Sequence, residues 1–219
     1  MIKYKISVLF LFIVFLYTFT FVRAKEYEPI LLGKIIYIDP GHGGLDPGAI
    51  YKEIKESEIN LSISKTLKEE LEKYGATVYL TRNGNYDLSE NNTQNKKRND
   101  LTARSRLINE SNCDMYISIH LNSDSSPAWY GAQVFYTNKN AENKKIAEIV
   151  QKLLKENLNT KREAKTIKNT YLYERIKRPG ILVEAGFISN PNERYLLNKT
   201  EYQQKIANVL TKGIIEYLK

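Results

Sequence analysis

The sequence predicts a single α/β domain, in which a twisted, mostly parallel or mixed sheet is flanked by helices and follows an N-terminal signal or anchor segment. After residue 33, short apolar runs alternate with segments of helical periodicity, which is the pattern of α/β proteins. With 219 residues, 42% of them hydrophobic, the chain is long enough to bury one core. The sequence contains no recognisable internal repeat, so we expect one domain over residues 34–219.

The first 24 residues differ in composition from the rest of the chain. Lys3 and Lys5 precede an uncharged stretch from Ile6 to Val22, and small residues follow, as at a signal peptide that is cleaved after Ala24. The uncharged stretch has 17 residues, the lower limit for crossing a bilayer, so an uncleaved membrane anchor is the alternative. In both cases we expect the domain to act outside the cytoplasm.

The formal net charge of +8 suggests an anionic partner. The first 24 residues hold three basic residues and no acid, which leaves +5 on the remainder. An exported basic protein suits an anionic cell envelope, whereas nucleic acid is not expected because the sequence has no zinc finger, RNP motif or basic helix. Simple solubility is the alternative explanation of the charge.

Five apolar runs predict the strands of the sheet. They are residues 34–39, 76–81, 115–120, 132–136 and 181–184. Cys113 precedes the third run and is the only cysteine, so we expect a buried thiol and no intramolecular disulfide.

Four periodic segments predict helices that cover the sheet. They are residues 57–75, 100–110, 141–158 and 200–219, the last with Thr200 as its N-cap. In "ISNPNE" we expect a further helix start, with Asn190 as N-cap, Pro191 as first helical residue and Glu193 bonding back to the cap. The polar segment 83–99 has no periodicity and is predicted to be a long loop.

Both histidines of the chain lie at ends of predicted strands. His42 sits in "DPGHGGLDPGA", a loop in which Asp39 and Asp46 each open a turn-like Asp-Pro-Gly, and His120 ends "YISIH". Glu184 closes a later strand, and Glu56 stands at the start of the first helix. Because the carboxyl ends of parallel strands share one edge of a sheet, these four residues can converge.

Two histidines and a carboxylate form the ligand set of a hydrolytic zinc site, whose fourth position holds a water with a pKa of about 7. Glycines at 41, 43 and 44 would let the backbone approach an ion or a substrate closely. A hydrolytic zinc site also needs a second carboxylate that shuttles protons from the water to the leaving nitrogen. Glu184 is a candidate, because an unpaired carboxylate on an apolar strand is costly to bury and its presence requires a function. Glu53 and Glu58 compete with Glu56 as ligand, and the same set also binds Fe(II).

Five blocks of the sequence resemble a known family. "DPGHGGLDPGA", "ESEINL", "LTARSRLIN", "YISIHLN" and "ILVEAGFISNPNE" are similar, in this order, to the zinc-dependent N-acetylmuramoyl-L-alanine amidases of the AmiC/CwlD type. The family usually has Glu-Lys before Asn-Leu at its ligand glutamate, and here Ser57 replaces the Lys. The resemblance implies zinc on His42, Glu56 and His120, with Glu184 as catalytic acid/base. It also implies cleavage of the amide between the lactyl group of muramic acid and L-alanine in peptidoglycan.

The finer resemblance is to the spore cortex amidases of the CwlD type, through "GAQVFY", "RPGILVEAGF" and "YQQKIANVLTKGI". It implies a role in forming muramic-δ-lactam, a location at the forespore or spore envelope, and possible control by a partner protein. Some relatives carry a helical insertion that blocks the zinc site, but "QVFYTNKNAENKKIAEIV" passes from strand to helix without room for one. Asn122, two residues after His120, is a candidate substrate-binding residue, and capping of the following turn is its alternative role.

Two other functions stay open on the residues alone. A zinc peptidase that cuts the stem peptide would use the same metal and base. A catalytically inactive wall-binding module would instead stack tyrosines on sugars, but it would have little use for Glu184.

Overall fold

The computed structural model describes residues 27–90 and 94–219, so the predicted signal or anchor segment lies outside the described residues. A six-stranded sheet forms the centre of the domain, in the order β4-β1-β5-β8-β6-β7. Its strands are β1 (Ile35–Pro40), β4 (Thr77–Leu80), β5 (Met115–Asn122), β6 (Gln133–Tyr136), β7 (Lys165–Thr166) and β8 (Gly180–Phe187). The first four in sheet order are parallel and β6 is antiparallel to β8, which confirms the mostly parallel, mixed sheet.

All five predicted strands are present. The short strand β7 and the hairpin of β2 (Ile50–Tyr51) and β3 (Ile54–Lys55) were not predicted. A strand of two residues is too short to show an alternation of apolar and polar side chains. The helices are α2 (Glu56–Lys73), α3 (Lys96–Glu110), α4 (Glu142–Asn157), α5 (Pro191–Leu197) and α6 (Thr200–Leu218). The predicted loop was too long at its C-terminal end, since α3 begins at Lys96.

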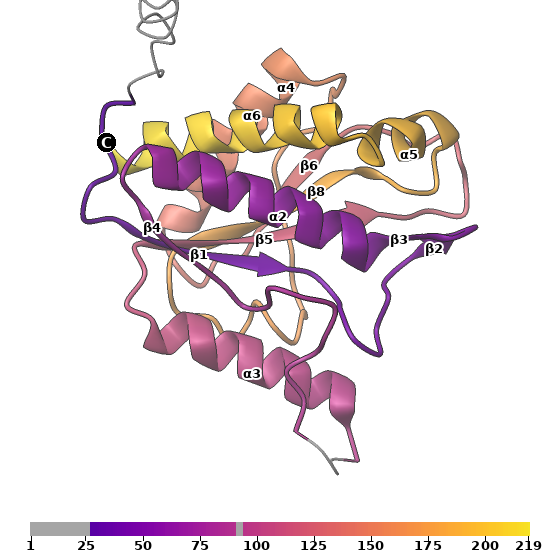
Figure 1. The fold of residues 1–219 in the computed structure, drawn as a ribbon, viewed down its shortest axis with the longest axis horizontal. Helices are drawn as coiled ribbons and strands as arrows, with labels where there is room; N and C mark the ends of the chain where they lie inside the picture. Colours follow the sequence, from indigo (N-terminus) through magenta and orange to yellow (C-terminus); the bar gives the residue numbers. More distant parts are fainter. Residues whose placement is uncertain (1–26, 91–93) are drawn as a thin grey trace, which may run out of the picture.

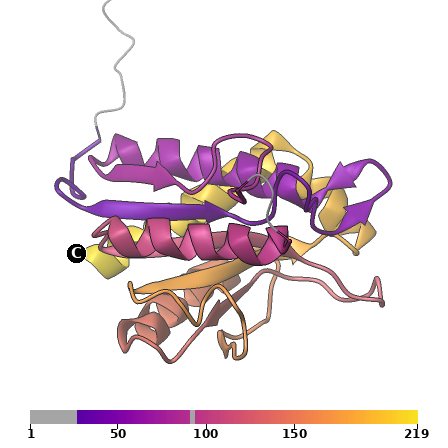
Figure 2. The same ribbon diagram turned by 90° about the horizontal axis from the view of Figure 1, so that it is seen from below.

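Helices cover both faces of the sheet (Figure 1). On one face, α2 packs on β1, β4 and β5, α4 packs on β6 and β8, and α6 lies between α2 and α4. Between these helices and the sheet lies the larger of two hydrophobic cores, into which Ile36 and Ile38 of β1 point. The opposite face is covered by α3, which lies in front of the strands in Figure 2. There Tyr37 joins a smaller core with Ile108 of α3 and the buried Cys113, as expected for this thiol.

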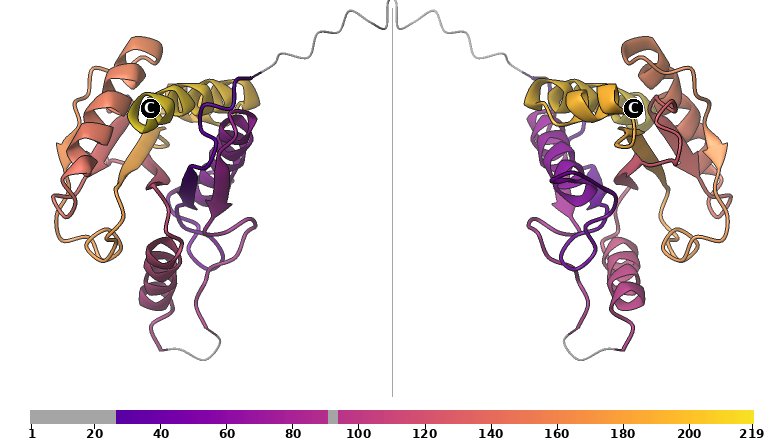
Figure 3. Two further views of the ribbon diagram at one scale, coloured as in Figure 1. Left: turned by 90° about the vertical axis from the view of Figure 1, so that its left-hand side faces the viewer. Right: turned by 90° about the vertical axis from the view of Figure 1, so that its right-hand side faces the viewer.

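The order in which the chain visits the strands of the sheet reverses between β1 and β5. From β1 it passes through α2 to β4 on one side, and from β4 through α3 to β5 on the other, so α2 and α3 lie on opposite faces (Figure 3). In an open α/β sheet, ligands bind in the crevice outside the carboxyl ends of the strands, at the point where the strand order reverses. The loop after β1 and the end of β5, where the two histidines lie, therefore flank this crevice.

Two capping predictions need correction. Asn190 caps α5 as expected, since its side chain accepts hydrogen bonds from the backbone N–H groups of Asn192 and Glu193. Glu193 does not bond back to the cap, because its carboxylate accepts the N–H groups of Phe187 and Gly131 instead. Thr200 is the first residue of α6 rather than its cap, and it makes no capping bond.

In the described part of the chain, no helix combines the length and the apolar character that crossing a membrane requires.

Candidate active site

Three of the predicted site residues meet in the crevice. His42 comes from the loop after β1, Glu56 is the first residue of α2, and His120 lies on β5. One ligand atom from each lies within 4.8 Å of the others, and the two imidazole rings are 4.8 Å apart, edge to face. This group of nitrogen and oxygen donors could hold a metal ion.

Glu56 joins the two histidines. Its Oε1 lies 3.2 Å from Nε2 of His42 and 3.1 Å from Nδ1 of His120. Burial alone would raise the pKa of Glu56, but hydrogen bonds and charge interactions with His120 and His42 lower it well below its usual value. Glu53 and Glu58 are exposed, so the structure selects Glu56 among the three candidates.

The backbone fixes the orientation of the Glu56 carboxylate. Its Oε2 accepts the N–H of Ala49 at 3.0 Å, and its Oε1 accepts the N–H of Leu121 at 3.1 Å. Asn60, one turn further along α2, donates from its amide to Oε1 at 3.2 Å. The Asn-Leu that follows the glutamate in the sequence thus supplies a residue that holds it in place.

Asp46 plays the same part for His42. Its Oδ2 lies 3.1 Å from Nδ1 of His42 and 3.2 Å from Nζ of Lys97 on α3. A carboxylate on one ring nitrogen fixes the tautomer that leaves the other nitrogen free to bind a metal. Burial raises the pKa of Asp46, but its hydrogen bonds to His42 and Gly48 outweigh that effect and lower it to about 2. From the sequence, Asp46 was expected only to open a turn.

Two glycines allow the histidines and Glu56 to come together. A Cβ on Gly41 would lie 2.3 Å from the His120 ring, and one on Gly48 would lie 2.6 Å from Oε2 of Glu56. The same loop holds His42 at φ 61°, a left-handed conformation that costs energy for a residue with a side chain. In the structure these close approaches are to side chains of the site, and the approach to an ion or a substrate that the glycines predicted stays a prediction.

Two buried arginines hold the loop after β1 from behind. Arg104 of α3, 1% exposed, binds Asp39 at 2.8 Å and the carbonyl of His42 at 2.7 Å. Arg82, which follows β4, donates to the carbonyls of Pro40 and Gly41 at 3.0 and 2.8 Å. Neither arginine was predicted to belong to the site, because an arginine in an amphipathic helix or after a strand is normally solvated. Arg104 lies inside the block "LTARSRLIN", whereas Arg82 lies in none of the five blocks.

Glu184 lies on β8 directly opposite His120 of β5. Its Oε2 is buried and has no hydrogen-bond partner among the described residues. Burial, together with the negative charge of Glu56, raises its pKa to about 7, while the two histidines oppose the shift. A carboxyl with this pKa can both accept and release a proton near neutral pH.

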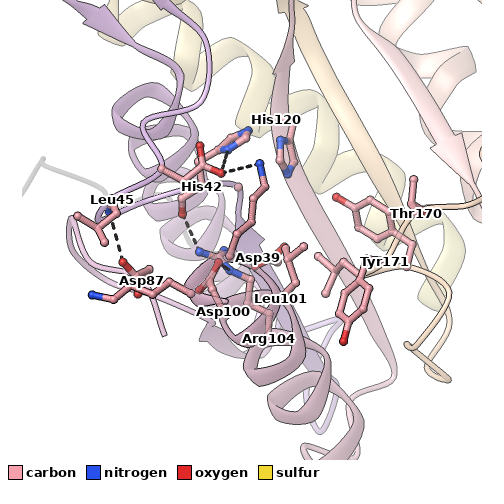
Figure 4. A pocket seen from close by; sticks show the side chains of 16 residues that line it. Asp39, His42, Leu45, Asp87, Asp100, Leu101, Arg104, His120, Thr170 and Tyr171 are labelled. Carbon is pink, nitrogen blue, oxygen red and sulfur yellow. Dashed lines mark hydrogen bonds and ion pairs between the residues drawn. The ribbon is translucent and has the colours of Figure 1, made fainter. Parts of the chain in front are cut away.

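A cavity of about 520 Å³ opens onto the two histidines (Figure 4). Leu45 lies along one wall, and Thr170 and Tyr171 lie along the other. Asp39, Asp100 and Arg104 form its floor. The size suits part of a peptide or a single small substrate.

Asn122 lies beyond an irregularity in the pairing of β5 with β8. Its Oδ1 accepts the N–H of Ser123, and its side chain does not line the cavity. The turn-capping role is thus present in the structure, and a substrate contact stays a prediction.

Comparisons with known proteins show the family of the chain. Residues 36–216 match the family described as N-acetylmuramoyl-L-alanine amidase. The chain is 43% identical over 215 residues to the germination-specific N-acetylmuramoyl-L-alanine amidase of Bacillus subtilis, covering 95% of this chain and 91% of that protein.

Solved structures show the same likeness. The CwlD amidase of Clostridioides difficile, in complex with the GerS lipoprotein, matches with a TM-score of 0.81 at 38% identity, over 84% of this chain and 98% of that one. An N-acetylmuramoyl-L-alanine amidase of Clostridium difficile 630 matches with a TM-score of 0.76 at 29% identity, over 84% and 96% of the two chains. The matched region contains every element that carries the site, and the resemblance found in the sequence is confirmed: the chain belongs to the N-acetylmuramoyl-L-alanine amidase family.

Proposed function

We propose that the protein is a zinc-dependent amidase that hydrolyses the bond between the lactyl group of N-acetylmuramic acid and L-alanine in peptidoglycan. The observation that carries the proposal is the group of His42, Glu56 and His120 next to the unpartnered carboxyl of Glu184. Family membership supplies the bond that is cut.

The four site residues have two tasks in this reaction, metal binding and proton transfer. His42, Glu56 and His120 would hold the zinc, which when bound would supply a water of lowered pKa and polarise the scissile carbonyl. Glu184 accepts the proton of the attacking water and delivers it to the nitrogen of L-alanine as the carbon–nitrogen bond breaks. Its buried Oε2, which has no hydrogen-bond partner among the described residues, is free to take part in both transfers.

The cavity beside the two imidazoles takes the first residues of the stem peptide. Leu45, Leu101 and Tyr171 offer it apolar contact, and the scissile amide lies at the end formed by His42 and His120. Asn122, on the same edge of the sheet, is proposed to hydrogen-bond the substrate after its side chain leaves the N–H of Ser123.

The cellular role proposed here is modification of the spore cortex, as a step toward muramic-δ-lactam. Support comes from the germination-specific relative of Bacillus subtilis, which matches along almost its whole length. This role places the domain outside the cytoplasmic membrane, at the forespore or spore envelope, exported by a segment that is cleaved or stays as an anchor.

A regulatory protein partner is also proposed. The CwlD amidase of Clostridioides difficile was solved as a complex with a lipoprotein, so a binding partner is compatible with this fold. Within the described residues, β6 and α4 are joined only by residues 137–141, which leaves no helix there to block the site. Control by compartment or by a partner is therefore favoured over control by a self-blocking helix.

One digestion tests the reaction. Purified peptidoglycan is treated with the wild type and with Glu184→Gln, and products are read by mass spectrometry with metal content measured on both proteins. We expect free stem peptides that begin with L-alanine, and about a 10²- to 10⁴-fold loss of rate in the variant at equal zinc content. Shortened peptides still attached to muramic acid would identify a peptidase, and loss of zinc in the variant would make Glu184 a ligand.

A further inference from the structure

The row of site residues continues beyond Glu184 across the sheet. His120 of β5 pairs with Glu184 of β8, which in turn pairs with Gln133 of β6. Leu182, two residues before Glu184 on β8, belongs to the smaller core, so Glu184 points to the α3 face. Because neighbouring strands lie about 5 Å apart, Gln133 lies only one strand away from Glu184, and the residues that it contacts lie beside the site.

Gln133 is buried and holds an arginine in a fixed position. Its side-chain oxygen accepts a hydrogen bond from Arg162 at 3.1 Å, and its amide donates to the carbonyl of Glu163 at 2.8 Å. Arg162 also donates to the carbonyl of Tyr130 at 2.8 Å. Its guanidinium lies 4.4 Å from the centre of the Phe187 ring, at the end of β8.

Arg162 supports an exposed aromatic pair. Its guanidinium lies 5.4 Å from the centre of the Trp129 ring, and Trp129 and Tyr130 are 54% and 45% exposed. These two side chains, with Lys161 and Arg162, line a hollow of about 480 Å³. The loop that carries them leaves β5 two residues after His120, at the end of the domain where β2 and β3 also lie (Figure 2). Two large rings kept in solvent by a fixed arginine are not explained by packing of the core.

We propose that Trp129, Tyr130 and Arg162 form a subsite for the glycan strand of peptidoglycan. The C–H face of a pyranose packs on an aromatic ring, and a guanidinium donates hydrogen bonds to sugar hydroxyl and acetamido oxygens. The muramic acid whose lactyl amide is cut lies at Glu184, and the adjoining sugar of the strand lies on Trp129. The glycan therefore crosses β8 and β6, while the stem peptide enters the cavity on the other side of the metal site.

This subsite rests on the proposed amidase function, and the test compares two substrates that share the scissile bond. One is a muramoyl peptide with a single sugar, and the other is a long uncrosslinked peptidoglycan strand. For Trp129→Ala we expect the ratio of kcat/KM on the strand to that on the single sugar to fall about two- to tenfold, as for one lost ring contact. Trp129→Phe keeps a ring and should restore most of the ratio.

Tyr79→Ala is the matched control, because Tyr79 is also an exposed aromatic but lies on β4 at the opposite edge of the sheet. It should leave the ratio unchanged. Equal losses on both substrates, or a strand preference that survives Trp129→Ala, would overturn the proposal.

A binding measurement separates the subsite from the catalytic function. Strands stripped of stem peptides are titrated into the wild type and Trp129→Ala, with calorimetric Kd as the readout. Weaker strand binding by the variant supports the subsite even if the wild type releases no peptide, whereas equal Kd values refute it. Loss of binding by Trp129→Phe as well would show that the residue acts through the shape of its loop, as expected for a surface that binds a protein instead.

Discussion

Two side chains of the candidate metal site, His42 and Glu56, have further partners that fix their orientation. Asp46 lies on the far nitrogen of His42, and backbone N–H groups of Ala49 and Leu121 hold Glu56. Such outer contacts decide how well a site is formed before a metal binds.

Removing the charge of Asp46 should weaken metal binding without removing a ligand. We expect Asp46→Asn to lower zinc affinity about 10- to 100-fold, because His42 loses the charged carboxylate that fixes its tautomer, and the one amide oxygen that remains is shared with the N–H of Gly48. Competition with a chromogenic chelator measures the affinity. Asp87→Asn is the control, since Asp87 contacts Leu45 and Ser89 rather than a histidine, and an equal loss there would contradict the role given to Asp46.

Glu184 should make the metal-free protein less stable as the pH rises. Its pKa of about 7 lies above its ordinary value of 4.5, so the folded state holds the proton more tightly than the unfolded state. The contribution of the neutral carboxyl is complete below about pH 4.5, declines as the pH rises, and is lost once the pH has passed 7.

Glu184→Gln removes this dependence. In chelator, the variant should gain about 2 to 3 kcal/mol relative to the wild type between pH 5 and pH 8, measured as unfolding free energy in urea. A constant difference between the two proteins over this range would show that burial does not raise the pKa of Glu184.

At the scale of elements, the loop between β1 and α2 is shaped by close approach rather than by flexibility. It brings Gly41 against His120 and Gly48 against Glu56, while Arg104 and Arg82 hold its carbonyls. The loop therefore joins β1, β5 and both layers of helices at the site.

Substituting Gly41 tests the need for this approach. Gly41→Ala places a Cβ 2.3 Å from the His120 ring, so we expect loss of most bound zinc together with a lower Tm. Gly33→Ala is the control: its Cβ meets nothing within 4 Å, and only its φ of 79° is unfavourable, which costs about 1 kcal/mol. Zinc content by mass spectrometry should fall in the first variant alone, and equal zinc in both would mean that the loop can relax.

The α5 start shows how an element-level pattern can mislead. Asn190, Pro191 and Glu193 match a capping box, and the cap and the proline behave as such. Glu193 instead accepts N–H groups from Phe187 and Gly131, because the end of β8 and the loop after β5 present unpaired donors beside it. A local motif cannot show that competition.

At the scale of the whole molecule, the site connects segments that are far apart in the chain. His42, Glu56 and His120 belong to the loop after β1, to α2 and to β5, so a bound metal ties three elements together. Zinc that binds only the folded state stabilises it by mass action.

Removing the metal should therefore lower the stability of the whole domain. With zinc at about 1,000 times its Kd, chelation should cost about 4 kcal/mol, visible as a drop in Tm by calorimetry. His120→Ala provides the reference, because a protein without the site should melt at the same temperature with and without chelator. An unchanged Tm for the wild type would contradict a metal held by these residues.

The residues alone left Glu56 in competition with Glu53 and Glu58, but they determined the fold class, the five main strands and the candidate site residues His42, His120 and Glu184. Those features depend on apolar periodicity and on polar residues at strand ends, both of which are local in the chain. The tertiary structure alone decided that Asp46 orients His42, that Arg82 and Arg104 are buried behind the loop, and that Glu184 aligns with His120 and Gln133. These relations depend on the order and register of strands that are distant in sequence, and no local pattern encodes which strands become neighbours.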